Sequence, residues 1–127
     1  MANKKIIYTD HAPDPIGPYS QAVLAGDTLY ISGQIGIDSF AGVLIDENIT
    51  KETEQVMDNL HAILEAAGMT FDNVVKCSIF LNSMDDFAAV NKVYGSYFGD
   101  DAPARETVAV KTLPKNVNVE ISAIAVR

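Results

Sequence analysis

The sequence has few of the residues that form disulfides or bind metals. It contains one cysteine, Cys77, which excludes an internal disulfide and a thiol-rich metal site. Its histidines, His11 and His61, are far apart and have no metal-ligand spacing, so we expect both to be structural or exposed and predict no metal. Cys77 falls within an apolar, β-branched run and is expected to pack in the core.

Positive charge is also scarce. Nine Lys and Arg stand against 17 Asp and Glu, which gives a formal net charge of −8. Because phosphate groups are bound by clustered Lys and Arg, this balance disfavours a nucleic-acid partner. The chain has no apolar run of membrane-spanning length and no apolar signal core, so we expect a cytoplasmic protein without a membrane partner. Walker, GxGxxG and HExxH motifs are missing as well.

What the sequence does contain is an ordinary apolar content and clear periodicity. A chain of 127 residues, 48% of them apolar, predicts one domain over residues 1–127 with a core of its own. One helix is expected over residues 50–67, capped by Thr50, and a second follows a capping sequence at 83–86 and ends near Phe98. Runs rich in β-branched residues predict strands at 5–9, 21–25, 28–32, 74–81, 105–111 and 117–126.

The order of these elements indicates an α+β fold, a single mixed or antiparallel sheet with the helices packed on one face. A Gly-Asp dipeptide joins the second and third strands as a β-hairpin. Pro114 occupies the second position of a turn at residues 113–116. We therefore expect the last two strands to pair as a closing hairpin.

Side chains alternate between the faces of a sheet along each strand, and helices on one side cover only one face. On this basis we expect the following residues beneath the helices: Leu29, Ile31, Val75, Cys77, Ile79, Leu81, Val108, Val110, Val119, Ile121, Ala123 and Ala125. If the hairpin register keeps the valines on that side, Arg105 and Glu120 share the opposite, open face. That face meets either water or another subunit. Ile124 and Val126 also fall on it, so we favour oligomerisation.

Arg105 and Glu120 are the residues best suited to chemistry. The guanidinium of Arg105 can bind a carboxylate through two hydrogen bonds, although a surface arginine at the start of a strand is the ordinary interpretation. Glu120 stands inside an apolar strand, where a carboxylate needs a partner or a function. It could act as a general base toward water, or form a structural salt bridge, for example to Arg105.

Other residues are weaker candidates for a binding site. Tyr19 follows a stiff proline-containing loop and would either present its phenol to a ligand or pack. Ser32 and Gly33 lie at a strand end, where backbone N–H groups are free to bind an anion. Asn91 lies within the second helix and is expected to face solvent.

Six segments in chain order form a recognisable pattern. They are IGPYSQAV (16–23), YISGQIG (30–36), AAGMTFDNVVK (66–76), DDFAAVNKVY (85–94), PAR (103–105) and LPKNVNVEISAIAV (113–126). PAR, followed at this spacing by LPK and VEI, is a specific combination. Through these segments nearly the whole chain resembles the Rid family, also called YjgF-like reactive intermediate deaminases.

The resemblance implies a chorismate-mutase-like fold and a homotrimer whose sheets form a barrel, with ligand clefts between subunits. It also implies cofactor-free hydrolysis of 2-imino acids, such as 2-iminobutanoate and 2-iminopropanoate, to 2-keto acids and ammonia. These imines arise when pyridoxal-phosphate-dependent dehydratases act on threonine or serine. Carried over by position, Arg105 would bind the substrate carboxylate, and Glu120 would orient or activate the attacking water. The remaining matched positions are cleft-lining residues: Tyr19, Ser32, Gly33 and Asn91.

One position departs from the family pattern. Many bacterial members have a cysteine in the cleft where this chain has Thr107, which keeps the small size but lacks the thiol. The change rules out thiol chemistry there and could alter the substrate range. Two other functions stay open: an endoribonuclease or translation inhibitor, as some members are labelled, and a protein that binds a small carboxylate without turnover.

Overall fold

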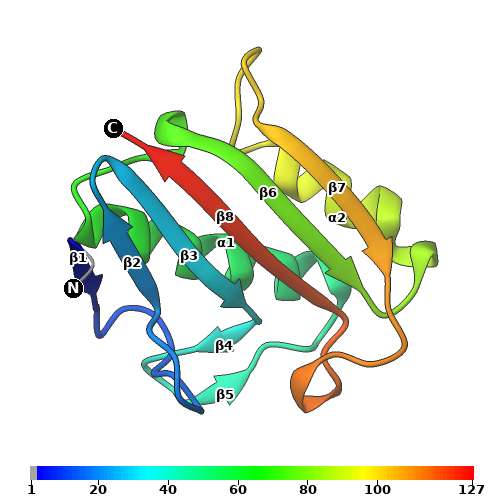
Figure 1. Ribbon diagram of the computed structural model, residues 1–127. Helices are drawn as coiled ribbons and strands as arrows, with labels where there is room; N and C mark the ends of the chain where they lie inside the picture. Colours follow the sequence, from blue (N-terminus) through cyan, green and yellow to red (C-terminus); the bar gives the residue numbers. More distant parts are fainter. Residues whose placement is uncertain (1–2) are drawn as a thin grey trace.

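The computed structural model describes residues 3–127, which form a two-layer α+β fold (Figure 1). Over these residues, six strands form one sheet in the spatial order β1-β2-β3-β8-β6-β7. The sheet strands are β1 (Lys4–Ile7), β2 (Ala22–Ala25), β3 (Thr28–Gln34), β6 (Val74–Leu81), β7 (Ala104–Ala109) and β8 (Val119–Val126). A separate short pair consists of β4 (Ile37–Asp38) and β5 (Val43–Leu44). The helices α1 (Ile49–Ala66) and α2 (Phe87–Gly95) pack on one face of the sheet, as predicted.

Elements with strong local signals lie where the sequence places them. β2 and β3 form the predicted hairpin, and Gly26 in its turn has a φ of 61°, a left-handed conformation that glycine adopts without steric cost. β6 has the predicted limits. The cap of α1 is not Thr50, because the helix begins earlier: the side-chain oxygen of Asn48 accepts the N–H of Lys51 at 2.8 Å.

The predicted closing hairpin does not form. β8 lies in the middle of the sheet, antiparallel to both β3 and β6, whereas β7 is an edge strand that runs parallel to β6 (Figure 1). β6, α2 and β7 are therefore a β-α-β unit, in which the helix crosses over and returns the chain in the same direction. The expected turn at 113–116 is instead part of a connection from the sheet edge to its centre.

The main core lies between the sheet and the helices α1 and α2. The predictions for helix-facing residues are confirmed at nine positions with 5% exposure or less: Leu29, Ile31, Cys77, Ile79, Leu81, Val119, Ile121, Ala123 and Ala125. They are wrong for Val75, which is 48% exposed beside a register shift in β6, and for Val108, which is 44% exposed. Val110 follows the end of β7 and packs against a smaller cluster formed by Ile35, Leu113 and Val117.

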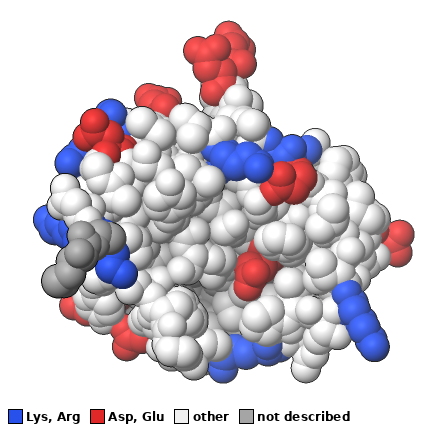
Figure 2. Space-filling model, viewed as in Figure 1, with Lys and Arg blue, Asp and Glu red and all other residues white. Residues whose placement is uncertain are grey.

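The open face of the sheet is mostly uncharged. Exposed or half-buried apolar side chains on it include Tyr30, Phe80, Val108 and Ile124, and Figure 2 shows most charged groups at its margin. Large apolar patches on a surface usually mark interaction sites. Self-association through this face stays a prediction. Within residues 3–127, no helix is both long and apolar enough to cross a membrane.

Candidate functional site

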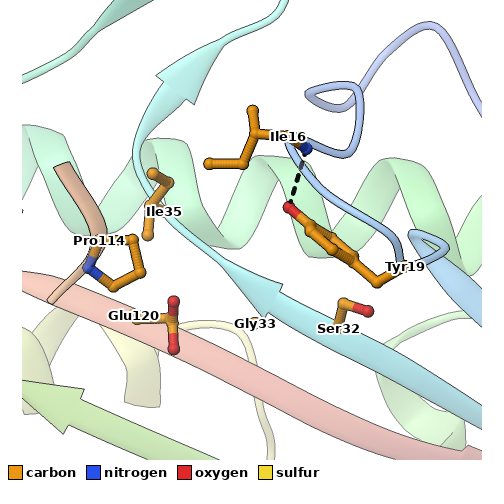
Figure 3. Close-up of a pocket in the computed structure, with 7 residues that line it drawn as sticks. All are labelled: Ile16, Tyr19, Ser32, Gly33, Ile35, Pro114 and Glu120. Atoms are coloured by element: carbon orange, nitrogen blue, oxygen red, sulfur yellow. Dashed lines mark hydrogen bonds between the residues drawn. The ribbon is translucent and has the colours of Figure 1, made fainter.

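A pocket of about 360 Å³ opens beside the end of β3. Three segments contribute to it: the proline-rich loop before β2, the end of β3, and the final connection together with β8. Its lining residues are Ile16, Tyr19, Ser32, Gly33, Ile35, Pro114 and Glu120. Figure 3 shows Glu120 and Pro114 on one side of this pocket and Tyr19 and Ser32 on the other.

Glu120 supplies the charge of the pocket. Its side chain projects from β8 and is partly buried. The ion pairs found among residues 3–127 are those of His61, Lys76 and Arg127, so the salt bridge considered for Glu120 is not formed there. Burial raises the pKa of the Glu120 carboxyl above its ordinary value. A carboxylate that is poorly solvated and has no cationic partner is a stronger base than an exposed one.

Gly33 is the residue that lets this carboxylate lie against β3. A Cβ atom on Gly33 would lie 2.7 Å from Cδ and 2.8 Å from Oε2 of Glu120, closer than such atoms can approach. The strand is irregular at this point, since its register with β8 shifts between Ile31 and Gln34. Bulges of this kind often occur beside active sites, where they redirect a side chain. A Cβ atom at this position would therefore push the end of the flexible Glu120 side chain out of its present place.

Ser32 and Tyr19 lie on the opposite side of the pocket. The N–H of Ser32 donates to the carbonyl of Gln21 at 2.9 Å, so the expectation that it is free for an anion is wrong. The Ser32 hydroxyl donates to the carbonyl of Ser20 at 2.6 Å. The oxygen of Tyr19 accepts the N–H of Ile16 at 3.2 Å, which leaves its own O–H to donate to a ligand. Tyr19 is 48% exposed and therefore lines the pocket rather than the core.

Arg105 lies on the other side of the sheet, on the edge strand β7, where it packs against α2. Its Nη1 donates to Oδ1 of Asn91 at 2.5 Å. The central guanidinium carbon lies 5.7 Å from the ring centroid of Phe87 and 5.1 Å from that of Tyr94. These three α2 residues follow one another at one-turn spacing, so a single helix face orients the guanidinium. The side chain stays exposed, with donors available to a ligand.

The prediction that Arg105 and Glu120 share a face is wrong. In the ladder with β6, Arg105 lies opposite Cys77, whose side chain points toward the helices. Glu120 lies opposite Phe80, which alternates with the buried Ile79 and Leu81 and points the other way. The physical reason is that β7 pairs in parallel with β6 and not with β8, so the register with β6 sets the face on which each β7 side chain lies. One chain, as described by residues 3–127, therefore presents two separate groups of candidate site residues, which we call the Arg105 half-site, on the helix side, and the Glu120 half-site, on the open side.

Thr107 belongs to the Arg105 half-site. On β7 it lies opposite Ile79 of β6. Its hydroxyl oxygen is buried and has no hydrogen-bond partner among residues 3–127. The hydroxyl of Tyr94 is in the same situation. Asn91 is exposed, as expected, but the structure shows it as a support for Arg105.

Cysteine and histidine take no part in either half-site. Cys77 is 1% exposed, and burial raises the pKa of its thiol, as expected of a core residue. His61 stacks on Phe71, and His11 packs edge-on against Phe40. In the described residues, no group of three or more His, Cys, Asp and Glu side chains is placed to hold a metal ion.

Sequence reasoning missed part of both half-sites. Ile16, Ile35 and Pro114 line the pocket, whereas the sequence predicts only a turn role for Pro114. Phe87 and Tyr94 hold Arg105. Their i, i+7 spacing around Asn91 places all three on one helix face, which is a signal that could have found this group.

Comparisons with known proteins agree on one family. The family model described as endoribonuclease L-PSP matches residues 9–127. A 2-iminobutanoate/2-iminopropanoate deaminase of Mus musculus is 48% identical over 124 residues, which cover 98% of this chain and 92% of the mouse protein. The fold and the half-sites define a small α+β protein with a carboxylate-containing pocket, and these matches place the chain in the endoribonuclease L-PSP family, also known as the YjgF or Rid family.

Solved structures give the same result. A crystal structure of a Rid-family protein from Yersinia pestis superimposes with a TM-score of 0.94 at 45% identity, covering 98% of this chain and 99% of that one. A crystal structure of E. coli TdcF with bound serine superimposes with a TM-score of 0.91 at 39% identity, covering 97% and 98% of the two chains.

Proposed function

We propose that this protein is a hydrolase acting on C–N bonds that converts small 2-imino acids, such as 2-iminobutanoate and 2-iminopropanoate, to 2-keto acids and ammonia. The observation that carries the proposal is the Glu120 carboxylate, partly buried in a pocket without an ion-pair partner among residues 3–127. The name of the mouse relative supports the substrate class. The serine bound by TdcF supports a site for a small α-carboxylate.

A complete site in this proposal is shared between two chains of a homotrimer. The carboxylate and the imine carbon of the substrate are bonded neighbours, so the groups that bind them must converge within a few ångströms. Arg105 and Glu120 of one chain point to opposite sides of the sheet. We propose that Arg105 on the edge strand of one subunit faces the Glu120 pocket of the next. The exposed apolar residues of the open face support such an assembly.

In this cleft Arg105 anchors the substrate. The guanidinium offers paired N–H groups whose geometry matches a carboxylate. Asn91 occupies one nitrogen, and the rings of Phe87 and Tyr94 restrict the orientation of the plane. The guanidinium of Arg105 is therefore oriented before the ligand binds, which lowers the loss of side-chain entropy on binding. Thr107 would lie beside the anchored group.

Glu120 acts on the water in the proposed reaction. The reacting form is the imine protonated on nitrogen. The water oxygen bonds to the imine carbon, a water proton passes to Glu120, and the C=N electron pair moves to nitrogen, which becomes the neutral amine of a tetrahedral carbinolamine. Glu120 returns the proton to that nitrogen, the C–N bond breaks with its electron pair on ammonia, and the carbinolamine hydroxyl gives its proton to Glu120 as it becomes the carbonyl of the 2-keto acid. The oxidation state of carbon does not change, so the reaction needs no cofactor. In this proposal the O–H of Tyr19 donates to the substrate; its lining of the pocket and its free donor support that role.

A coupled assay tests this function. Threonine dehydratase generates 2-iminobutanoate, and the release of 2-ketobutanoate is followed with and without this protein. We expect faster release, and Arg105→Ala should abolish the increase. Absence of acceleration, or an Arg105→Ala variant as active as the native protein, would contradict the proposal. Salt-dependent RNA binding lost in the same variant would favour the endoribonuclease of the family description.

A further inference from the structure

A second glutamate, Glu52, lies behind the pocket. It belongs to the first turn of α1 and is only 2% exposed. Its Oε2 accepts the backbone N–H of Asn118 at 2.9 Å, and its Oε1 accepts Nδ2 of the same residue at 2.9 Å. Asn118 lies between Pro114 and Glu120 in the chain. Glu52 is thus bonded to the segment that forms one side of the pocket.

The same residue also lies against the segment that follows β3. A Cβ atom on Gly36, two residues after the end of β3, would lie 3.0 Å from Cγ of Glu52 and 3.1 Å from its carbonyl oxygen, so this segment packs closely against α1. Two turns further along α1, Nδ2 of Asn59 donates to the carbonyls of Ile35 and Ile37, both at 3.0 Å. One face of α1 therefore holds both the segment that follows β3 and the residue that precedes β8.

The connection before β8 holds two residues in an unfavourable backbone conformation. In the connection before β8, Lys115 and Asn116 have φ values of 55° and 56°, in the left-handed region that costs a non-glycine residue on the order of 1 kcal/mol. Such conformations persist where the surroundings determine them. Leu113 and Val117 are buried on either side, and the next residue is the one bonded to Glu52.

Stability alone is a poor reason for this arrangement. A buried carboxylate is costly, and replacing buried ionic groups by apolar ones is often neutral or stabilising. The partners of Glu52 are neutral amide groups, and the ion pairs found in residues 3–127 do not include it. The positive end of the α1 dipole offsets part of the cost. The Glu52 carboxylate instead supplies two acceptor oxygens, which hold the two N–H donors of Asn118 at a defined position.

We infer that Glu52 is a positioning residue for the pocket. It fixes the separation between the segment that carries Gly33 and Ile35 and the segment that carries Pro114 and Glu120. The catalytic consequence rests on the proposed function: the carboxylate that activates water is held by a second carboxylate that never touches substrate. Loss of this support displaces Glu120 from the imine carbon but leaves the Arg105 anchor unchanged.

The test compares Glu52→Leu with a matched control and a conservative variant. Leucine accepts no hydrogen bond, so both donors of Asn118 lose their acceptor. Thr53→Val removes a neighbouring buried hydrogen bond, from the Thr53 hydroxyl to the carbonyl of Ile49 within α1, and Thr53 does not line the pocket. In Glu52→Gln the amide oxygen accepts the backbone N–H, and the side-chain amide of Asn118 can turn over so that its Oδ1 accepts the new N–H, which keeps both bonds.

We expect Glu52→Leu to lower kcat about tenfold, while the dissociation constant of 2-ketobutanoate changes less than about threefold. Amide hydrogen exchange should become faster in residues 33–36 and 115–118 of this variant. Thr53→Val should show neither change, and Glu52→Gln should stay close to the native protein in both. Equal behaviour of Glu52→Leu and Thr53→Val, or the same losses in Glu52→Gln, would overturn the inference. If the native protein does not hydrolyse imines, the proposed function fails, while the exchange data still decide the role of Glu52.

Discussion

The two half-sites of this molecule are built in opposite ways. Arg105 is exposed on an edge strand, yet its guanidinium is bonded to Asn91 and flanked by two aromatic rings. Glu120 is partly buried in the centre of the sheet, where ion-pair partners among residues 3–127 are lacking and desolvation raises its carboxyl pKa. In the proposed function, the group that binds substrate is held by satisfied contacts, whereas the group that accepts a proton is left without an ion-pair partner among residues 3–127. The difference predicts distinct responses to mutation.

The largest effect is expected on the Glu120 side. Glu120→Gln keeps the size of the side chain but removes the base, so kcat should fall by about 10²–10⁴-fold. Binding of 2-ketobutanoate, measured by calorimetry, should change little because Arg105 is intact. Native-like turnover in this variant would remove Glu120 from the chemistry. Carboxylate binding without turnover in the native protein would indicate a binding protein.

Substitution on the Arg105 side should act on binding instead. Arg105→Lys keeps the charge but loses the planar fork, and a charge-assisted hydrogen bond contributes about 1.5–3 kcal/mol. We therefore expect the dissociation constant of 2-ketobutanoate to rise by about 10–100-fold. Lysine that binds the keto acid as tightly as arginine would show that the fork is not the anchor.

Gly33→Ala tests the contact beneath the base. The added Cβ would lie 2.7 Å from Cδ of Glu120, so the carboxylate must move. Because the end of the Glu120 side chain can move aside, we expect kcat to fall about tenfold with little change in the melting temperature. Gly99→Ala is the matched control, because a Cβ there meets nothing within 4 Å. Equal activity of the two variants would mean that the Glu120 position is not critical.

Asn91→Ala should have a smaller effect of the same kind as Arg105→Lys. It removes one hydrogen bond to the guanidinium and leaves the flanking rings in place. A loss of about 1 kcal/mol corresponds to a rise of about fivefold in the dissociation constant of 2-ketobutanoate. The value of kcat should be unchanged. A selective loss of kcat would instead place Asn91 beside the reacting atoms.

The smallest effect concerns stability and pH. Since the pKa of Glu120 is higher in the folded chain than in the unfolded chain, the unfolded state loses its proton first as pH rises. Its contribution to stability is therefore fully present below the unfolded pKa and is lost as pH rises through the folded value. Glu120→Gln should be more stable than the native protein at pH 7, by less than about 1 kcal/mol. In denaturant titrations this difference should vanish toward pH 4.

Local sequence signals predicted the local parts of this fold. The β2–β3 hairpin, α1 and β6 depend on turn residues, periodicity and β-branched runs, and they lie close to the predicted positions. The partner of β7 could not be predicted in this way. A strand that follows a turn and one that follows a crossover helix have the same composition, and only the tertiary arrangement selects β6 over β8. Pairing of β7 with β8 would place Arg105 on the open face of the sheet, whereas its pairing with β6 places Arg105 on the helix side.

The candidate site, too, could be predicted only where a residue stands out in its local sequence. Glu120 stood out because a charge within an apolar strand is unusual, and the structure places it in a pocket. Glu52 gave no such signal, since an acidic residue in the first turn of a helix normally faces solvent and favours the helix dipole. Its burial depends on Asn118, which is 66 residues away in the chain. Contacts at that separation cannot be read from composition or spacing.

In the proposed assembly, Arg105 of one chain and Glu120 of another complete each site. This arrangement is tested by mixing two inactive variants, Arg105→Ala and Glu120→Gln, with different affinity tags and purifying assemblies that contain both. In a cyclic trimer with one Arg105–Glu120 pair per interface, every mixed assembly has one intact pair, so imine hydrolysis should recover to about one third of the native rate. If both residues of a site came from the same chain, every site would lack one of them, and the mixed assemblies would stay inactive.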